Sequence, residues 1–443
     1  MRLVCTTTSI RDGLFWSETE LAPGSEHTTE LVRIHPSFRY QTFEGFGGAF
    51  TEAAGYCFSK LGAEAQREVL EGYFGTTGLR YVLGRTPMNS CDFALGNYAC
   101  VEDPTDTALE SFSIERDRRY ILPLLKAAQA HSADPIRLML SPWSPPAFMK
   151  TNGSMNGGGS LKPEFAPMWA DCIVRYIQAY RAEALHVAMV SVQNEPAAAQ
   201  SWDSCLYTAE EEGAFAALLG TKLHAAGLDD IQLLVWDHNK ELLFPRMDTI
   251  LQNADAARYV SGAGFHWYTG DHFEALALVR ERYPGMKLYF TEGCVEYSRF
   301  ADRDGLQKAE MIAHDILGNL AAGMHGSIDW NLLLDAQGGP NHVGNYCEAA
   351  IMCTEDAAGV EKRPAFHYIG HFSRFIRPGA VRLALTRYTD AIEAVCLENP
   401  DGERVTVLLN RADKDLTVSL SDGEKTVFLV VKAHTIATVR QLP

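Results

Sequence analysis

The chain has 443 residues, of which 47% are hydrophobic and 21% charged, and these proportions are typical of a folded globular protein and argue against extended disorder. Its 39 basic and 56 acidic residues give a formal net charge of −17, which opposes binding to nucleic acid or anionic membrane surfaces and favours a neutral or cationic ligand. Ten cysteines occur without a C-x-x-C pair, so neither a disulfide framework nor a structural zinc knuckle is indicated.

The N-terminal segment gives no export signal. Its first ten residues lack the apolar stretch of about 7 to 15 residues that a secretory signal needs, and no window reaches about 18 apolar residues in a row. We therefore expect a cytoplasmic enzyme without integral membrane contact. The sequence carries no signal for or against an oligomer.

Short strands open the chain, and a repeating pattern follows them. Residues 1–40 alternate polar and apolar positions without a convincing helix, which predicts peripheral strands at 31–34 and 38–41. From residue 43 onward, short apolar strands alternate with helical patterns, as βα units around a parallel sheet do. The predicted strands are 43–50, 81–86, 136–141, 187–193, 231–236, 262–268, 288–291 and 327–330. The predicted helices are 66–73, 115–130, 167–183, 209–226, 242–254, 273–282, 307–322 and 366–375.

These alternating elements predict an α/β fold in two parts. Eight parallel strands with intervening helices close most naturally into a (β/α)₈ TIM barrel, which we place at residues 41–377. Strand patterns separated by turn signals then return, as an antiparallel β-sandwich at 378–443 requires. They lie at 391–397, 404–409, 416–420, 426–431 and 435–439. We expect the strands of residues 1–40 to join them, so that both termini form the side domain.

Two of the predicted barrel strands end in a lone glutamate. Glu195 follows the uncharged run 187–193, and Glu292 ends the hydrophobic run 288–291. The carboxyl ends of barrel strands meet on one face, so this pair predicts acid–base or nucleophilic chemistry there. Either glutamate alone is weak support, because an acidic residue after a strand is more often a helix cap or a solvated charge.

The other strand ends carry aromatic, amide and acidic side chains. These are Asp92, Trp143, Asn194, Asp237, His238, His266, Trp267, Tyr268, Trp330 and Asn331. Apolar sugar faces stack on indole rings, and sugar hydroxyls bind carboxylates and amides, so the composition predicts a carbohydrate site. Any one of the tryptophans could equally be an ordinary core residue.

Motifs along the chain resemble those of glycoside hydrolase family 30, the glucosylceramidase family. The resemblance runs from about residue 43 to the C-terminus. It rests on Gly45-Phe-Gly-Gly-Ala-Phe-Thr51, Ser90-Cys-Asp-Phe93, Ser141-Pro-Trp-Ser-Pro145, Lys150-Thr-Asn-Gly153, Asn194-Glu-Pro196, His266-Trp-Tyr268, Glu292-Gly-Cys294, Asp329-Trp-Asn-Leu332, Gly338-Gly-Pro-Asn341 and His371-Phe-Ser-Arg-Phe375. Ten motifs in the same order are a specific signal, and the fold that they imply agrees with the pattern of elements.

The resemblance implies roles for the two glutamates and for the residues beside them. Glu195 would be the general acid/base and Glu292 the nucleophile of a double displacement that retains anomeric configuration. Asn194 would contact the sugar 2-hydroxyl, while Arg85 and Tyr268 would keep Glu292 ionised.

The resemblance also implies how the terminal sugar is held. Asp92, Trp143 and Trp330 would bind it, and Asn345 would lie at the rim of the pocket. The segment 341–345 departs from the more hydrophobic sequence that the family has there, which leaves the preference for a lipid open.

The expected function is therefore a retaining β-glycosidase that hydrolyses terminal β-glucosides and resembles glucosylceramidases, with a carbohydrate or glycolipid substrate and no cofactor or metal. The family also contains β-xylosidases, fucosidases and endo-β-1,6-glucanases, which stay open as alternatives. A non-catalytic carbohydrate-binding barrel would not need both Glu195 and Glu292. A metal-dependent barrel enzyme would need three convergent ligands, which Asp92, Asp237 and His238 do not obviously supply.

Three further signals favour structural roles. The glycine-rich segment 157–159 lacks the residues of a phosphate or dinucleotide site. His367 and His371 have the spacing of zinc ligands on a helix, but no glutamate follows the first histidine, so we expect them to pack. Cys294, two residues after Glu292, is expected to be a buried structural thiol.

Overall fold

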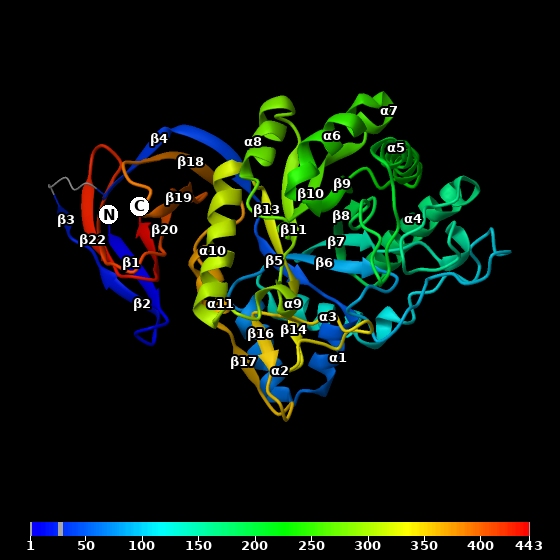
Figure 1. Ribbon diagram of the computed structural model, residues 1–443, viewed down its shortest axis with the longest axis horizontal. Coiled ribbons are helices and arrows are strands. Elements are labelled where there is room, and N and C mark those ends of the chain that lie inside the picture. The colour runs from blue at the N-terminus through cyan, green and yellow to red at the C-terminus, as the bar shows by residue number, and fades with distance from the viewer. Residues whose placement is uncertain (1, 25–29, 443) are drawn as a thin grey trace.

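A computed structural model describes residues 2–24 and 30–442 and shows two parts (Figure 1). A barrel occupies the right of the view, a β-sheet domain lies at its left, and both chain termini lie in that domain. Three parts of the predicted sandwich segments lie outside the described residues, namely residue 1, residues 25–29 and residue 443.

Eight parallel strands form the closed barrel, as predicted. In chain order they are β5 (Phe46–Ala49), β6 (Leu83–Met88), β7 (Arg137–Pro142), β8 (His186–Ser191), β9 (Gln232–Asn239), β10 (Val260–His266), β11 (Lys287–Glu292) and β13 (Gly326–Asn331). Each pairs in parallel with its neighbours, and β13 closes the ring on β5. Each predicted strand overlaps one of these. The first is shorter than predicted, because Phe43 ends the preceding strand β4 (Glu30–Phe43).

Helices surround the barrel. They are α1 (Glu52–Lys60), α2 (Ala63–Phe74), α3 (Ile121–His131), α4 (Ala166–Ala182), α5 (Ala209–Ala225), α6 (Leu243–Gln252), α7 (Ala254–Ala257), α8 (Phe273–Arg282), α9 (Tyr297–Phe300), α10 (Gly305–Ala322) and α11 (Pro364–Ser373). The sequence prediction missed α1, which has only nine residues.

The predicted start of the helix at 115–130 is wrong, because the α-helix begins only at Ile121. The fully buried side chain of Asp117 instead accepts hydrogen bonds from the hydroxyls of Tyr98, Tyr176 and Tyr180. These tertiary contacts hold residues 117–119 in a 3₁₀ turn.

Both termini contribute to one ten-stranded sheet that folds into the β-sandwich, as predicted. Its order is β2-β1-β23-β20-β19-β18-β4-β21-β22-β3. The remaining bounds are β1 (Leu3–Ser9), β2 (Leu14–Glu20), β3 (Pro23–Gly24), β18 (Ala380–Arg387), β19 (Glu393–Glu398), β20 (Arg404–Asn410), β21 (Leu416–Ser421), β22 (Thr426–Val431) and β23 (Thr435–Gln441). The sequence prediction missed β1, β2, β3 and β18.

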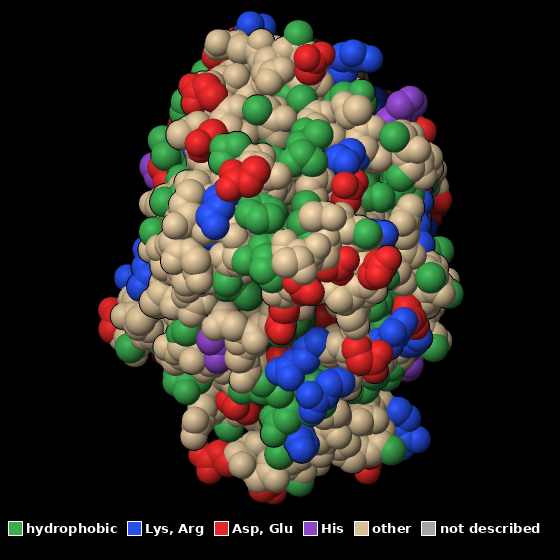
Figure 2. Space-filling view, turned by 90° about the vertical axis from the view of Figure 1, so that its right-hand side faces the viewer, with side chains coloured by type: hydrophobic (Ala, Val, Ile, Leu, Met, Phe, Trp, Pro, Cys, Tyr) green, Lys and Arg blue, Asp and Glu red, His purple; other side chains and the backbone are tan. Residues whose placement is uncertain are grey.

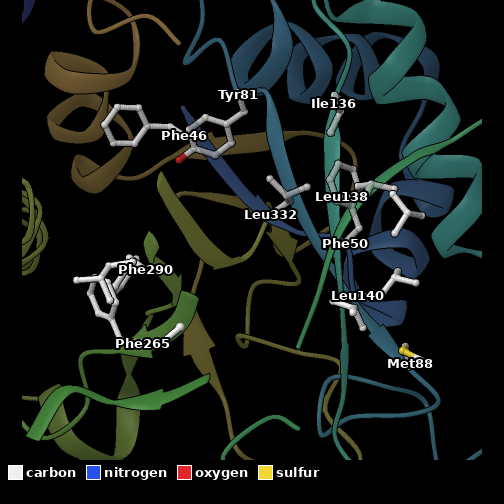
Figure 3. Packing of buried hydrophobic residues seen from close by; sticks show 14 of the residues in the cluster. Phe46, Phe50, Tyr81, Met88, Ile136, Leu138, Leu140, Phe265, Phe290 and Leu332 are labelled. Atoms are coloured by element: carbon white, nitrogen blue, oxygen red, sulfur yellow. The ribbon is translucent and has the colours of Figure 1, made fainter. Parts of the chain in front are cut away.

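The apolar positions alternate between separate cores. On β7, Met139 points into the barrel interior, whereas Leu138 and Leu140 belong to the cluster outside it, beside Phe50 (Figure 3). On β20, Val407 and Leu409 belong to that same large cluster, while Leu408 belongs to the core of the sandwich. This period of two is what strands covered on both faces require.

The sandwich packs against α10 and α11, which lie between it and the barrel strands (Figure 1). His371 on α11 is fully buried there, and its two ring nitrogens lie 2.8 Å from Thr8 Oγ1 and 2.9 Å from Thr438 Oγ1. Both ring nitrogens of His371 are therefore taken up by contacts with threonine hydroxyls, so they are not placed to bind zinc. Among the described residues no helix is long and apolar enough to cross a bilayer.

Candidate active site

The strand ends surround a cavity of about 250 Å³ on the face toward which β6 and β7 point (Figure 1). Figure 2 looks at this face, where acidic side chains gather near the middle and a group of basic side chains lies below them. The residues lining the cavity include Asp92, Trp143, Asn194, Glu195, Tyr268, Glu292, Trp330 and Asn345. Arg85, the remaining predicted site residue, is fully buried and contacts Glu292 and Asn194.

Glu195 is held on an unusual backbone just past β8. The amide N–H of Asn194 donates to Pro142 on β7 at 2.8 Å, and that of Glu195 donates to Asp237 on β9 at 3.0 Å. Glu195 has a φ of +48°, in the left-handed region that non-glycine residues seldom adopt. Hydrogen bonds to the flanking strands therefore hold Glu195 in this strained backbone conformation. Backbone strain of this kind concentrates at functional sites.

The Glu195 carboxylate is surrounded by polar side chains. His266 Nδ1 lies 3.4 Å and His238 Nε2 lies 3.8 Å from its Oε1, and Gln200 Nε2 donates to Oε2 at 3.4 Å. Burial acts to raise the pKa of the Glu195 carboxyl, but the hydrogen bond from His266 and the charges of His238 and His266 lower it overall.

Glu292, at the end of β11, makes shorter contacts. Arg85 Nη1 donates to its Oε2 at 2.6 Å, and the Tyr268 hydroxyl donates to its Oε1 at 3.0 Å. Burial raises the pKa of Glu292, and the charge of Glu195 adds to this effect, against the opposing charges of His266 and Arg85. One oxygen of Glu195 and one of Glu292 lie within 4.8 Å of each other.

His266 lies between Glu195 and Asp237. Its Nε2 lies 3.2 Å from Asp237 Oδ1, while its Nδ1 faces Glu195. Burial acts to lower the pKa of His266, but the charges of Glu292 and Asp237 and the hydrogen bonds to Asp237 and Glu195 raise it to about 9. At neutral pH His266 is therefore protonated. Because His266 is fully buried and Glu195 lines the cavity, Glu195 is the one of the two that can reach a ligand.

Asp237 is the anchor beneath the site. Its carboxylate accepts from Arg85 Nη2 at 3.0 Å and from three hydroxyls, those of Ser141, Ser191 and Thr291, at 2.6 to 2.9 Å. Burial alone would raise the pKa of Asp237, but the charge of Arg85 and the hydrogen bonds from His266 and Thr291 lower it far below its ordinary value. An ionised Asp237 fixes Arg85, which in turn donates to Asn194 Oδ1 at 2.7 Å.

Asp92 lines the cavity and is almost fully buried. Its Oδ2 accepts from Asn341 Nδ2 at 3.3 Å and from Asn345 Nδ2 at 3.2 Å, so the segment 341–345 closes over it. Burial, with a further effect of the Glu292 charge, raises the pKa of Asp92 well above its ordinary value. A buried acidic group of this kind favours a ligand that offers hydrogen-bond donors.

Two tryptophans also line the cavity. The rings of Trp143 and Trp330 stack with centroids 5.3 Å apart, and the Arg85 guanidinium lies 4.5 Å from the Trp143 ring. Both indoles are more than nine-tenths buried, so each presents only part of its ring to the cavity. They serve the core and the site together.

Several residues of the site had no individual role in the sequence prediction. Asp237 and His266 follow apolar runs, so their place at strand ends was a usable signal, but their mutual contact was not. Gln200 and Asn341 lie in irregular loops, and no pattern in the sequence points to them. Cys294 lies 3.5 Å from the Tyr268 hydroxyl, and burial raises the pKa of its thiol, which favours the structural role predicted for it.

Glu195, His266 and Glu292 also stand close enough to ligate a cation, with ligand atoms within 4.8 Å of one another. The Arg85 guanidinium, however, lies against Glu292, and its positive charge would oppose a metal ion there. The contacts therefore favour two carboxyl groups that are each hydrogen-bonded to neighbouring side chains, rather than a metal centre.

Comparisons with known proteins agree with this architecture. The chain matches the glycosyl hydrolase family 30 TIM-barrel domain over residues 43–376 and the glycosyl hydrolase family 30 beta sandwich domain over residues 379–439. It is 36% identical to lysosomal acid glucosylceramidase of Mus musculus over 414 residues, which cover 89% of this chain and 80% of that protein.

Two solved structures are similar over the full length of both chains. SrfJ from Salmonella typhimurium is 38% identical, with a TM-score of 0.96 and 100% of each chain covered. An endo-β1,6-glucanase is 27% identical, with a TM-score of 0.90 and the same coverage.

Proposed function

Because the chain belongs to glycoside hydrolase family 30, we propose that it is a retaining β-glycosidase that releases terminal β-linked glucose by double displacement. The observation that carries this proposal is the pair of carboxyl groups, Glu195 and Glu292, with oxygens within 4.8 Å of each other in one cavity. Retaining enzymes place the two groups about 5 to 5.5 Å apart, whereas inverting enzymes need about 6.5 to 9.5 Å for a water molecule between them.

The contacts of each carboxyl group support its role. Burial raises the pKa of Glu292, and the contacts from Arg85 and Tyr268 oppose this by stabilising the anionic form that a nucleophile needs. The protonated His266 contacts Glu195, which can take up from it the proton that the leaving oxygen requires. When the sugar is bonded to Glu292, that residue loses its charge, so the pKa of Glu195 falls further and Glu195 becomes the base that activates water.

The closed end of the cavity supports exo action. Asp92, with Asn341 and Asn345 above it, stands where a longer chain would have to continue past the terminal sugar. Asn194, fixed by Arg85, is placed beside Glu195 for the 2-hydroxyl, whose contact strengthens as positive charge develops at the anomeric carbon.

Two leaving groups are suggested by relatives. Glucosylceramide is the first, because the mouse protein of 36% identity is named a glucosylceramidase. The second is a β-1,6-linked glucan, because a structure with a TM-score of 0.90 is an endo-β1,6-glucanase. β-Xylosides and β-fucosides remain alternatives for the sugar itself.

Hydrolysis of a panel of substrates tests the proposal. The panel holds 4-nitrophenyl β-glucoside, β-xyloside and β-fucoside, glucosylceramide in detergent, and a β-1,6-glucan. We expect the β-glucoside to be cleaved fastest among the aryl substrates, with β-glucose as the first product in proton NMR spectra. Initial release of α-glucose would contradict the retaining mechanism, and cleavage of the glucan at internal bonds would contradict exo action.

A further inference from the structure

Further polar residues line the cavity around Glu195. Gln200 and His238 contact the Glu195 carboxylate there, and Glu296 lines the same cavity. Thr269 and Arg299 complete the lining. Because the general acid faces the departing oxygen, these residues surround the leaving group of a substrate whose terminal sugar lies toward Asp92.

The side chains of this region are polar and offer both donors and acceptors. Arg299 Nη1 lies 3.1 Å from Glu296 Oε2 and donates to the Tyr268 carbonyl at 2.6 Å, while nearly half of the Arg299 side chain stays exposed. Thr269 donates to Glu241. A guanidinium, a carboxylate, an amide and a hydroxyl are together able to bind adjacent sugar hydroxyls, which act as donor and acceptor at once.

We propose that Gln200, Thr269, Glu296 and Arg299 form a leaving-group subsite that binds a second sugar residue rather than the hydrocarbon of a lipid. The inference deepens the proposed function and rests on it: the substrate class is a short β-linked gluco-oligosaccharide, cleaved from its non-reducing end. A lipid chain laid over this region would cover charged groups without replacing their hydrogen bonds to water, which is unfavourable.

The loop that carries Gln200 is fixed from below. The buried Lys150 ammonium donates to the carbonyls of Met155 at 2.9 Å and Ser204 at 2.5 Å, and the Gln200 amide N–H donates to Ser204 Oγ at 3.1 Å. The Gly157 N–H donates to the Gln200 carbonyl at 2.8 Å. A subsite on such a loop is pre-organised, so little conformational entropy is lost when a sugar binds.

The other side of the subsite is tied to the reaction centre. Glu296 lies on strand β12 (Val295–Glu296), which pairs with β15 (Cys347–Glu348) and follows the Glu292 strand. Arg299 contacts the backbone of Tyr268, whose hydroxyl donates to Glu292. Exposed apolar side chains nearby in the chain, Leu95 and Tyr346, follow the sugar-binding residues Asp92 and Asn345 and do not line the cavity.

Leaving-group dependence of kcat/KM tests the subsite. We compare 4-nitrophenyl β-glucoside, octyl β-glucoside and β-linked glucose disaccharides, gentiobiose first, for wild type, Arg299→Ala and Glu296→Gln. Each substitution should lower kcat/KM on the best disaccharide about tenfold more than on the aryl glucoside, the factor that loss of one charge-assisted hydrogen bond produces. The matched control is Arg303→Ala, an exposed arginine on the same segment whose ion pair, with Asp302, is long at 3.9 Å; it should leave the ratio unchanged.

A second measurement uses the glycosyl-enzyme as a probe. With 2,4-dinitrophenyl β-glucoside as donor, methyl β-glucoside should accept glucose in wild type and lose this ability in Arg299→Ala, whereas 1-octanol at equal concentration should be a poor acceptor in both. Three outcomes would overturn the subsite and leave the proposed function intact. They are better transfer to octanol than to methyl β-glucoside, a preference for octyl β-glucoside over all disaccharides, and an unchanged substrate ratio in both variants. Failure to cleave any aryl β-glucoside would overturn both.

Discussion

Replacement of Asp92 tests how the terminal sugar is recognised. Both amide contacts of Asp92 fall on Oδ2, which leaves Oδ1 for a ligand, and the residue is only 4% exposed. A hydrogen bond contributes about 0.5 to 1.5 kcal/mol between neutral groups and about 1.5 to 3 kcal/mol to a charged group, and the raised pKa of Asp92 puts its bonds between these two cases. If Asp92 accepts from two sugar hydroxyls, Asp92→Ala should cost about 2 to 4 kcal/mol of transition-state stabilisation, or about 30- to 1,000-fold in kcat/KM, since 1.36 kcal/mol is tenfold.

The assay compares 4-nitrophenyl β-glucoside with the β-xyloside, which lacks the 6-hydroxyl. If Asp92 binds the 6-hydroxyl, which the xyloside lacks, the loss on the glucoside should exceed the loss on the xyloside. Asp92→Asn serves as the matched variant, since it keeps the shape and replaces an acceptor oxygen by a donor. Equal losses on both sugars would refute the assignment to the 6-hydroxyl, and activity near wild type would remove Asp92 from the sugar site.

Three further predictions concern other parts of the account. Glu195→Gln should slow substrates with poor leaving groups most and regain turnover with azide as a glycosyl azide; equal slowing of activated and unactivated substrates would contradict the acid/base role. Tyr268→Phe removes the 3.0 Å hydrogen bond to Glu292 and should lower kcat/KM on the aryl glucoside about 10- to 100-fold without a change in melting temperature, whereas undiminished activity would show that Glu292 does not depend on it. Burial lowers the pKa of His371 to about 3, so below about pH 6.5 the unfolded chain binds a proton that the folded chain does not, and the free energy of unfolding falls as the pH drops. In urea titrations, His371→Gln should remove about 2 to 3 kcal/mol of the fall between pH 7 and 4.5. An equal fall in wild type and variant would show that the neutral state of His371 does not limit stability in acid.

The barrel could be predicted because its signal is local. Each strand is an apolar run with a polar residue at its end, and strands of one barrel present those ends to a common face. Glu195 and Glu292 follow directly from this rule, since both stand where β8 and β11 finish. The short first strand escaped the prediction because Phe43 and Phe46 look alike in the sequence, although they belong to different sheets.

The parts that could not be predicted depend on contacts between distant segments. Asp117 breaks the predicted helix because three tyrosines up to 63 residues away satisfy it. Gln200 reaches Glu195 because a lysine 54 residues before Ser204 holds the loop. The Asp237–His266 contact gives His266 its charge, and no spacing rule links these residues. Such partners become visible only in three dimensions.

Trapping of the glycosyl-enzyme tests whether Glu292 is the residue that attacks the anomeric carbon. The protein is incubated with 2-deoxy-2-fluoro-β-glucosyl fluoride, and the intact chain and its peptides are weighed by mass spectrometry. The account predicts one fluoroglucosyl group per chain, on the peptide that contains Glu292, with Glu292→Gln unlabelled. Inactivation without a covalent group, or a group on Glu195 or any other residue, would contradict it.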